Sequence, residues 1–206
     1  MKLIKINIEN PESKKIEQIV KALKKSKTVV IPTDTAYGLA GNALDKKANK
    51  KVFTIKERPY FKPLSVLVSG LKMAEKIAYF NAQARKIFKK FLPGPLTIVV
   101  KKKKILPDIL TSEQPNVGIR CSNDKLTRAI MKKINFPITA TSANLSGKKV
   151  PYSIKEILKQ YKDQKTKPDL LVDAGKLPKV APSTVIDLSR KKIKILRKGP
   201  IILKIK

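Results

Sequence analysis

The fold class follows from residues 3–32, LIKINIENPESKKIEQIVKALKKSKTVVIP. Apolar and polar side chains alternate over Leu3–Ile8, as they do in a half-buried strand. Ser13–Lys25 then places apolar residues three or four positions apart, which is the spacing of one face of a helix. Thr28–Ile31 is a second apolar run, and it ends at Pro32. A strand, a helix and a second strand in this order are typical of an α/β fold.

Strands and helices continue to alternate along the rest of the chain. Asp45 is placed to cap a helix that runs to about Lys56. The hydrophobic spacing predicts further helices over residues 71–79, 82–91, 124–134 and 153–161. It predicts further strands over residues 64–68, 96–100, 117–120, 138–141, 170–172, 183–187 and 193–196. Because neither an internal repeat nor a domain linker interrupts the pattern, we expect residues 1–206 to form one domain.

The composition excludes several classes of protein. The chain has no histidine, so a Ser-His-Asp triad and the usual zinc ligands are absent. Its single cysteine, Cys121, can form neither an internal disulfide nor a thiolate zinc cluster. No segment approaches the roughly 18 apolar residues of a membrane span, and no export signal is visible. We therefore expect a soluble, cytoplasmic protein whose chemistry depends on positioned charges and hydroxyl groups.

The net charge of +32 has two interpretations. Clustered cations are typical of proteins that bind nucleic acids. However, only six of the 47 basic residues are arginines, and the remaining 41 lysines are scattered along the chain or occur in runs at 101–104 and 191–192. This pattern also fits a compositional drift toward lysine that has no bearing on partners. Three arginines, Arg58, Arg120 and Arg197, are more informative because they fall within polar loops or at strand ends.

Five segments rich in polar residues, Gly or Pro adjoin the predicted strands and helices. They are residues 32–39 (PTDTAYGL), 56–59 (KERP), 141–147 (TSANLSG), 182–185 (PSTV) and 196–200 (LRKGP). Since ligands in open α/β sheets bind where strands end, we expect the polar groups to gather at one edge of the sheet. The chain has neither a P-loop motif nor a GxGxxG fingerprint. Its fixed cations and hydroxyl groups instead suit carboxylate and polyanion binding, with charge stabilised in the transition state.

These segments carry a resemblance to a known family. Together with PLS at 63–65, FLPGPLT at 91–97, VGIR at 117–120, PSTVIDL at 182–188 and LRKGPI at 196–201, they resemble the YrdC/Sua5 family of threonylcarbamoyl-AMP synthases. The matches occur in family order from about residue 28 to residue 201. The resemblance implies a twisted mixed sheet flanked by helices, with a large basic concave cleft. Because the chain ends at Lys206, soon after LRKGPI, it resembles the short YrdC form, which lacks the further domain of Sua5-type members.

The resemblance also implies a reaction. L-Threonine and bicarbonate form a carbamate, which attacks the α-phosphate of ATP to give threonylcarbamoyl-AMP and pyrophosphate for the N6-threonylcarbamoyladenosine modification of tRNA. Threonine's amine can react with bicarbonate-derived carbon dioxide without a strong enzymic base, in agreement with the lack of histidine. Mg²⁺ is expected to accompany ATP, with no protein ligand that can be assigned. Downstream threonylcarbamoyl transferase proteins are the implied partners, and tRNA or double-stranded RNA is a further candidate.

Roles carry over from the family position by position. The implied L-threonine contacts are Thr35, Arg120, Ala140 through its backbone, and Ser183. The implied catalytic residues are Lys56, Arg58, Ser142 and Asn144. The implied ATP contacts are Arg58, Lys62, Asn116, Ser142, Asn144, Val150 and Arg197. Two of these positions depart from the family, which often has Asn at position 62 and Ser at position 150.

Two other functions fit parts of the sequence. A non-catalytic module could hold double-stranded RNA by its backbone, although 5% aromatic residues and no Trp disfavour base stacking. A related paralogue could adenylate a carbamate formed on an acceptor other than threonine. Binding of threonine and ATP separates the three, because the RNA module should bind neither ligand and the paralogue should bind nucleotide alone.

Overall fold

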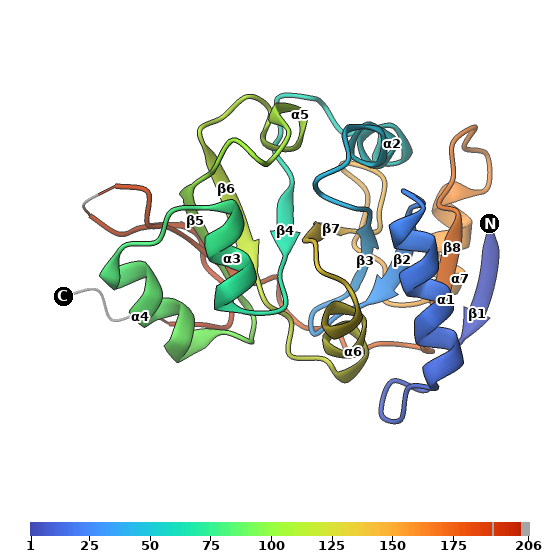
Figure 1. Cartoon of the computed structure of the whole chain (residues 1–206). Helices are drawn as coiled ribbons and strands as arrows, with labels where there is room; N and C mark the ends of the chain where they lie inside the picture. Colours follow the sequence, from blue (N-terminus) through green and yellow to red (C-terminus); the bar gives the residue numbers. More distant parts are fainter. Residues whose placement is uncertain (191, 203–206) are drawn as a thin grey trace.

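The N-terminal strand, helix and second strand form as predicted (Figure 1). The structure is a computed structural model that describes residues 1–190 and 192–202. Helix α1 (Ser13–Lys24) buries its apolar face at Ile16, Ile19, Val20 and Leu23, and it packs on strand β2 (Val29–Pro32). Burial of these side chains is what stabilises the helix, since each contributes about 1.5–3 kcal/mol when fully removed from water.

The described residues form one mixed ten-stranded sheet in the order β1-β8-β2-β3-β7-β4-β6-β5-β9-β10. The remaining strands are β1 (Lys2–Lys5), β3 (Tyr37–Ala40), β4 (Ser65–Leu67), β5 (Leu96–Lys101), β6 (Asn116–Arg120), β7 (Ile138–Ser142), β8 (Leu170–Asp173), β9 (Thr184–Asp187) and β10 (Lys194–Arg197). The remaining helices are α2 (Lys46–Lys56), α3 (Leu71–Ile77), α4 (Ala82–Phe91), α5 (Asp108–Thr111), α6 (Lys125–Lys133) and α7 (Ile154–Tyr161).

The strand pairing confirms the predicted mixed sheet. β8 runs parallel to both β1 and β2, whereas β7 runs antiparallel to both β3 and β4. β4 and β6 are parallel, as are β5 and β9. One hydrophobic cluster extends from Ile4 of β1 to Ile186 of β9, so the described residues share a single core.

Several predicted helix ends are confirmed. Asp45 caps α2 by accepting from the backbone N–H groups of Lys47 and Ala48. Asp124 caps α6 in the same way through the N–H of Thr127. Ser153 caps α7 by accepting from the N–H of Glu156, whose carboxylate accepts from the N–H of Tyr152. Each cap satisfies a backbone donor that has no partner within its helix.

Strand β3 begins within the polar segment 32–39, where we predicted no strand. Tyr37 and Leu39 are fully buried, and β3 pairs antiparallel with β2 to form a hairpin around residues 33–36. The Tyr37 hydroxyl donates to the carbonyl oxygen of Gly175 at 2.7 Å. A Gly between two buried residues weakens the sequence signal for a strand, and tertiary burial overrides it here.

Two element ends and one short helix differ most from the prediction. Helix α3 ends at Ile77 rather than at 79, because Ala78 turns to an extended conformation and pairs with Lys102. Strand β1 ends at Lys5 rather than at residue 8. The short helix α5 has no counterpart in the prediction, since four residues are too few to show a helical period.

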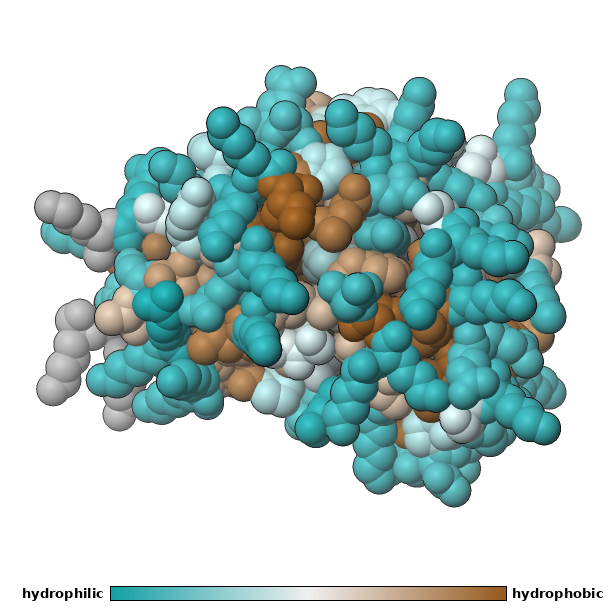
Figure 2. All heavy atoms as spheres, viewed as in Figure 1, coloured by the Kyte–Doolittle hydropathy of each residue, from teal (hydrophilic) through white to brown (hydrophobic). Residues whose placement is uncertain are grey.

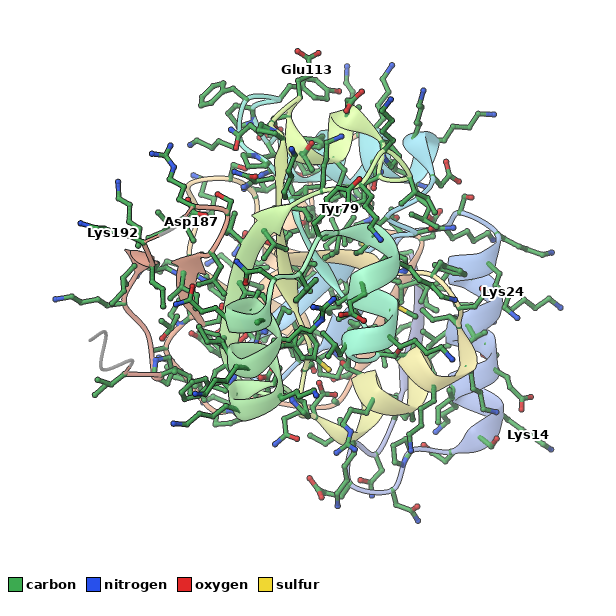
Figure 3. All side chains as sticks on the ribbon, turned by 60° about the vertical axis from the view of Figure 1, so that its left-hand side comes forward. Lys14, Lys24, Tyr79, Glu113, Asp187 and Lys192 are labelled. Atoms are coloured by element: carbon green, nitrogen blue, oxygen red, sulfur yellow. The ribbon has the colours of Figure 1, made fainter. Side chains whose placement is uncertain are left out.

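The two faces of the sheet are covered differently. Helices α1, α3, α4 and α6 cover one face, which is toward the viewer in Figure 1. Long hydrophilic side chains surround the apolar surface between these helices (Figure 2). Lys14 and Lys24 point outward from α1 (Figure 3), as expected for solvated lysines. None of the described helices is long and apolar enough to cross a bilayer.

The lysine run at 101–104 is only partly solvated. Lys102 pairs with Asp108 at 2.5 Å with a side chain 12% exposed, and Lys103 donates to the carbonyl oxygen of Glu75 at 2.6 Å. The side chains of these two lysines therefore bond to neighbouring segments and are not fully solvated. In the second run, Lys191 lies outside the described residues.

Candidate active site

A cavity of about 290 Å³ lies over the sheet face opposite to α1, α3, α4 and α6. The alternation of β4 shows which face this is. Ser65 and Leu67 line the cavity, whereas Val68 lines a separate hollow with Phe88 of α4 and Met131 of α6. Because alternate residues of a strand point to opposite faces, the cavity and the helices lie on opposite sides of the sheet.

The cavity spans the middle of the sheet rather than the edge that we expected. Its strand residues come from β2, β3, β7, β4, β6, β5, β9 and β10, and those away from the strand ends include Gly38, Thr139 and Val185. Val150, Tyr152, Val180 and Pro182 line it from segments outside the strands. The polar segments therefore meet because the chain folds back over the sheet face.

Arg120, at the end of β6, is tied to the hairpin between β2 and β3. Its Nη2 donates to Asp34 Oδ1 at 2.5 Å and to Thr35 Oγ1 at 3.0 Å. The side chains of Arg120 and Asp34 are both 13% exposed. A guanidinium held in this way is fixed in orientation, and its planar fork suits a carboxylate ligand.

Arg197 is fastened in a similar way to the segment before β9. Its Nε donates to the carbonyl oxygen of Ser183 at 2.9 Å, and its Nη2 donates to Ser183 Oγ at 3.0 Å. The same hydroxyl lies 2.9 Å from Thr97 Oγ1 of β5. Burial, with a smaller effect from Arg120, lowers the pKa of Arg197. The two guanidinium groups therefore supply positive charge to one cavity.

Arg58 is held by the loop that follows α2. Its Nε donates to the carbonyl oxygen of Lys62 and its Nη2 to that of Pro63, both at 2.9 Å. Burial lowers the pKa of this guanidinium. In contrast, the Lys62 ammonium lies over the ring of Phe61, 5.7 Å from its centre. Arg58 reaches the cavity, and Lys62 does not line it.

Lys56 donates hydrogen bonds to the main chain at the end of β7 and just after it. The side chain is buried, and its ammonium donates to the carbonyl oxygens of Ser142 and Asn144. Asn144 Nδ2 donates to the carbonyl oxygens of Leu145 and Lys148, at 2.8 and 2.7 Å. Burial, followed by the charge of Arg58, lowers the pKa of Lys56 to about 7. Lys56 and Asn144 therefore shape the segment that presents Ser142.

The structure brings together eight of the residues predicted for the site. Those that line the cavity are Thr35, Arg58, Arg120, Ala140, Ser142, Val150, Ser183 and Arg197. Four others do not line it, namely Lys56, Lys62, Asn116 and Asn144. Asn116 instead donates to Ser189 Oγ at 3.2 Å. The roles of all these residues remain predictions.

Sequence reasoning missed several polar groups of the cavity. Thr97 and Thr139 line it from strands that we predicted from their apolar residues. A hydroxyl recurring on otherwise apolar strands is the signal that could have indicated them, because buried polar groups need partners. Tyr152 also lines the cavity, and its hydroxyl donates to the carbonyl oxygen of Val180 at 3.3 Å. This contact joins two segments distant in sequence, which no local pattern predicts.

Comparisons with known proteins find similar sequences over nearly the whole chain. The family model Sua5/YciO/YrdC, described as telomere recombination, matches residues 21–199. A putative threonylcarbamoyl-AMP synthase from Methanocaldococcus jannaschii is 42% identical over 202 residues, which cover 97% of this chain and 94% of that protein.

Two solved structures have the same fold. The structure of P. abyssi Sua5 complexed with L-threonine matches with a TM-score of 0.90 and 32% identity, and the match covers 97% of this chain and 58% of that one. The structure of E. coli YciO matches with a TM-score of 0.88 and 26% identity, covering 99% of this chain and 98% of that one. This chain therefore shares its fold with both proteins, and it spans little more than half of the P. abyssi protein.

Proposed function

Since the chain belongs to the Sua5/YciO/YrdC family, we propose that it is an L-threonylcarbamoyladenylate synthase. It would form threonylcarbamoyl-AMP and pyrophosphate from L-threonine, bicarbonate and ATP. The observation that carries this proposal is that one cavity collects both halves of the expected site. Thr35, Arg120 and Ser183 represent the threonine half, and Arg58 and Arg197 represent the nucleotide half.

The threonine half offers a fixed cation beside hydroxyl groups. Arg120 would bind the carboxylate of L-threonine, and Thr35 Oγ1 lies 3.0 Å from its Nη2. The hydroxyl of Ser183 is held by Arg197 and Thr97. Binding in a fixed orientation would present the amine to carbon dioxide formed from bicarbonate. The resulting carbamate supplies the oxygen that attacks ATP.

The nucleotide half would stabilise negative charge. Attack of the carbamate oxygen on the α-phosphate breaks the bond to the β-phosphate oxygen, and pyrophosphate leaves with its charge. Arg58 and Arg197 line the cavity from the loop after α2 and from β10. Cations already fixed by hydrogen bonds need little reorganisation during the reaction, which is the condition for effective electrostatic catalysis.

The protein residues do not fit a dedicated magnesium cage. The described ranges 1–190 and 192–202 contain no group of three or more acidic, Cys or His side chains that could hold a metal ion. The carboxylate of Asp34, next to the cavity residue Thr35, already accepts a hydrogen bond from Arg120. We propose that Mg²⁺ arrives bound to the phosphates of ATP, which is a common arrangement for this ion.

The product would serve the N6-threonylcarbamoyladenosine modification of tRNA. Threonylcarbamoyl transferase proteins would then consume the adenylate, and we place these reactions in the cytoplasm with ATP and tRNA. Direct contact with tRNA or double-stranded RNA remains part of the proposal. Exposed lysines such as Lys14 and Lys24 would provide phosphate contacts whose affinity falls with rising salt.

The test is release of pyrophosphate by the purified protein with ATP, Mg²⁺ and bicarbonate, with and without L-threonine. Serine in place of threonine is the control for the side-chain methyl group. Release that depends on threonine supports the proposal. Release that ignores threonine indicates an adenylating paralogue with another acceptor. Silence from folded protein, together with binding of double-stranded RNA, supports the non-catalytic alternative.

A further inference from the structure

The hydroxyl of Ser122 lies between two carboxyl groups. Its oxygen is 2.7 Å from Asp34 Oδ1 and 2.6 Å from Asp124 Oδ2. Ser122 is 2% exposed, so water has little access to the contact. Both separations are hydrogen-bond distances, and each bond needs one proton. A serine hydroxyl supplies one proton, whereas a carboxylate supplies none.

A second proton must therefore lie in this chain of three oxygens. We propose that Asp124 holds this proton and donates it to Ser122, which in turn donates to Asp34 and so orients Arg120 for the threonine carboxylate. Ser122 and Asp124 are then positioning residues that act through Asp34 and do not touch substrate. The inference rests on the proposed function for the role of Arg120, although the shared proton itself does not.

The neighbours of the two carboxyl groups indicate which one is protonated. Asp34 Oδ1 accepts from the Arg120 guanidinium at 2.5 Å, so this oxygen already serves as an acceptor. Asp124 Oδ1 accepts from the N–H of Thr127, so Oδ2, which faces Ser122, is the oxygen that can carry the proton. Burial, and to a smaller extent the charge of Asp34, raises the pKa of Asp124.

The other titratable groups nearby are consistent with this assignment. The thiol of Cys121 has a pKa raised mainly by burial, so it is a neutral neighbour. Arg128 of α6 acts on that thiol as a positive charge, and the described residues show no ion pair between Arg128 and Asp124. Asp34 and Arg120 therefore form the charged pair of the cluster, and Asp124 is its neutral member.

Asp45 is a matched comparison within the same chain. Like Asp124, it caps a helix with Oδ1 and has a serine hydroxyl, that of Ser26, within hydrogen-bond distance of Oδ2. Its serine has no second carboxyl partner among the described contacts. The Ser26 hydrogen bond is the largest effect on Asp45 and lowers its pKa. Asp124 differs in two respects: it is much more deeply buried, which raises its pKa although its contact with Ser122 acts in the opposite direction, and its serine hydroxyl is shared with a second carboxyl group.

The geometry explains why Arg120 needs this support. Asp34 Oδ2 and Arg120 Nε are both buried without a hydrogen-bond partner in the described part of the chain. The ion pair is therefore held through Nη2 and Oδ1 alone, rather than through two parallel bonds. Ser122 supplies the second donor to Oδ1. Without it, Asp34 and the guanidinium could rotate together.

The proton is tested by infrared spectroscopy with isotope-labelled aspartate in wild type, Asp124→Asn and Asp45→Asn. Wild type at neutral pH should show the carbonyl band of one protonated carboxyl group. The band should vanish in Asp124→Asn and persist in Asp45→Asn. Absence of the band from wild type, or its survival in Asp124→Asn, overturns the proposal. This measurement needs no substrate.

The positioning role is tested by calorimetry with L-threonine. Ser122→Ala should weaken threonine binding roughly tenfold, the size expected for one hydrogen bond to a charged group. Asp124→Asn should bind like wild type, because the amide still donates to Ser122. Wild-type affinity should fall as pH rises through the pKa of Asp124, and Asp124→Asn should lack this fall.

Unchanged threonine affinity in folded Ser122→Ala overturns the positioning role, as does a pH dependence that persists in Asp124→Asn. Thermal melting checks that both variants fold. ATP binding is the internal control, and an equal loss for ATP would also overturn the role by indicating general disruption. Failure of wild type to bind threonine at all would count against the proposed function, while the infrared band still decides the shared proton.

Discussion

The ammonium nitrogen of Lys56 lies 2.7 Å from the main-chain carbonyl oxygen of Asn144. Lys56 is the last residue of α2, and Asn144 follows β7, so this contact joins two elements 88 residues apart. The side chain is buried, and the described residues offer it carbonyl and amide oxygens but no carboxylate. A buried cation of this kind is retained at a cost in solvation. Its hydrogen bond to the carbonyl oxygen of Ser142 supports a role in shaping the nucleotide half of the cavity.

Replacement Lys56→Met removes the ammonium and keeps a chain of similar length. The carbonyl oxygens of Ser142 and Asn144 would lose their partner, at about 1–3 kcal/mol for each buried group left unsatisfied. We expect pyrophosphate release to fall more than tenfold (~1.4 kcal/mol). Lys50→Met, on the exposed side of the same helix, is the control and should match wild type. Full activity in Lys56→Met would contradict the supporting role.

The same lysine predicts a pH dependence of stability. The pKa of Lys56 is about 7 when folded, against an ordinary value of 10.5. Between these values the unfolded chain binds more protons, so the free energy of unfolding should rise with pH, by at most about 1.4 kcal/mol per unit. The stabilisation by neutral Lys56 is therefore largest above pH 10.5, and it is lost as pH falls to about 7. Urea unfolding of wild type and Lys56→Met from pH 6 to 10 isolates it, and a constant difference would contradict the lowered pKa.

Arg197→Lys tests the two hydrogen bonds that the Arg197 guanidinium donates to Ser183. A lysine cannot make the two bonds that Nε and Nη2 make to the carbonyl and hydroxyl oxygens of Ser183. We expect kcat/KM for ATP to fall about tenfold, or ~1.4 kcal/mol. Arg190→Lys changes an exposed arginine in the preceding turn and serves as the control. A similar loss in both variants would indicate a general effect of charge placement rather than this contact.

Gly199 sets how closely the end of the chain approaches β9. A Cβ at this position would lie 2.5 Å from the backbone nitrogen of Thr184 and would also overlap the carbonyl oxygen of Pro182. Gly199→Ala must therefore move backbone, at roughly 1–3 kcal/mol, and should also weaken ATP use through Arg197. Gly70→Ala is the control, because its Cβ would meet no atom within 4 Å. Thermal melting compares the two, and an equally small effect would argue against the close approach.

The fold was largely predictable because most elements have a local signal. Helix α4 (Ala82–Phe91) has the predicted bounds, since an Asn cap and a following Pro define its ends. Strand β3 was missed because its burial depends on β2 and β7, which flank it in the sheet. The N-terminal pairing with β8 was equally invisible, as it joins residues about 170 positions apart.

The site was predictable as a set of residues but not as a shape. The resemblance to a family supplied Thr35, Arg120 and Ser183, and the structure places all three on one cavity. What the sequence could not give is which partners hold them. The Arg120–Asp34 pair joins β6 to a hairpin 86 residues away, and no local pattern indicates such a contact. The expectation of a site at the sheet edge failed for the same reason, because later segments fold back over the sheet face.

Thr35→Ala provides the last test of the threonine half. The hydroxyl accepts from Arg120 Nη2 at 3.0 Å and lies 3.3 Å from Thr33 Oγ1. Its removal leaves Arg120 bound to Asp34 alone, so the guanidinium loses one of two restraints. We expect the KM for threonine to rise roughly tenfold, the size of one hydrogen bond to a charged group, with little change for ATP. Thr35→Ser restores the hydroxyl and should recover most of the affinity. An equal effect on both substrates, or no recovery in Thr35→Ser, would show that the hydroxyl does not act through the threonine site.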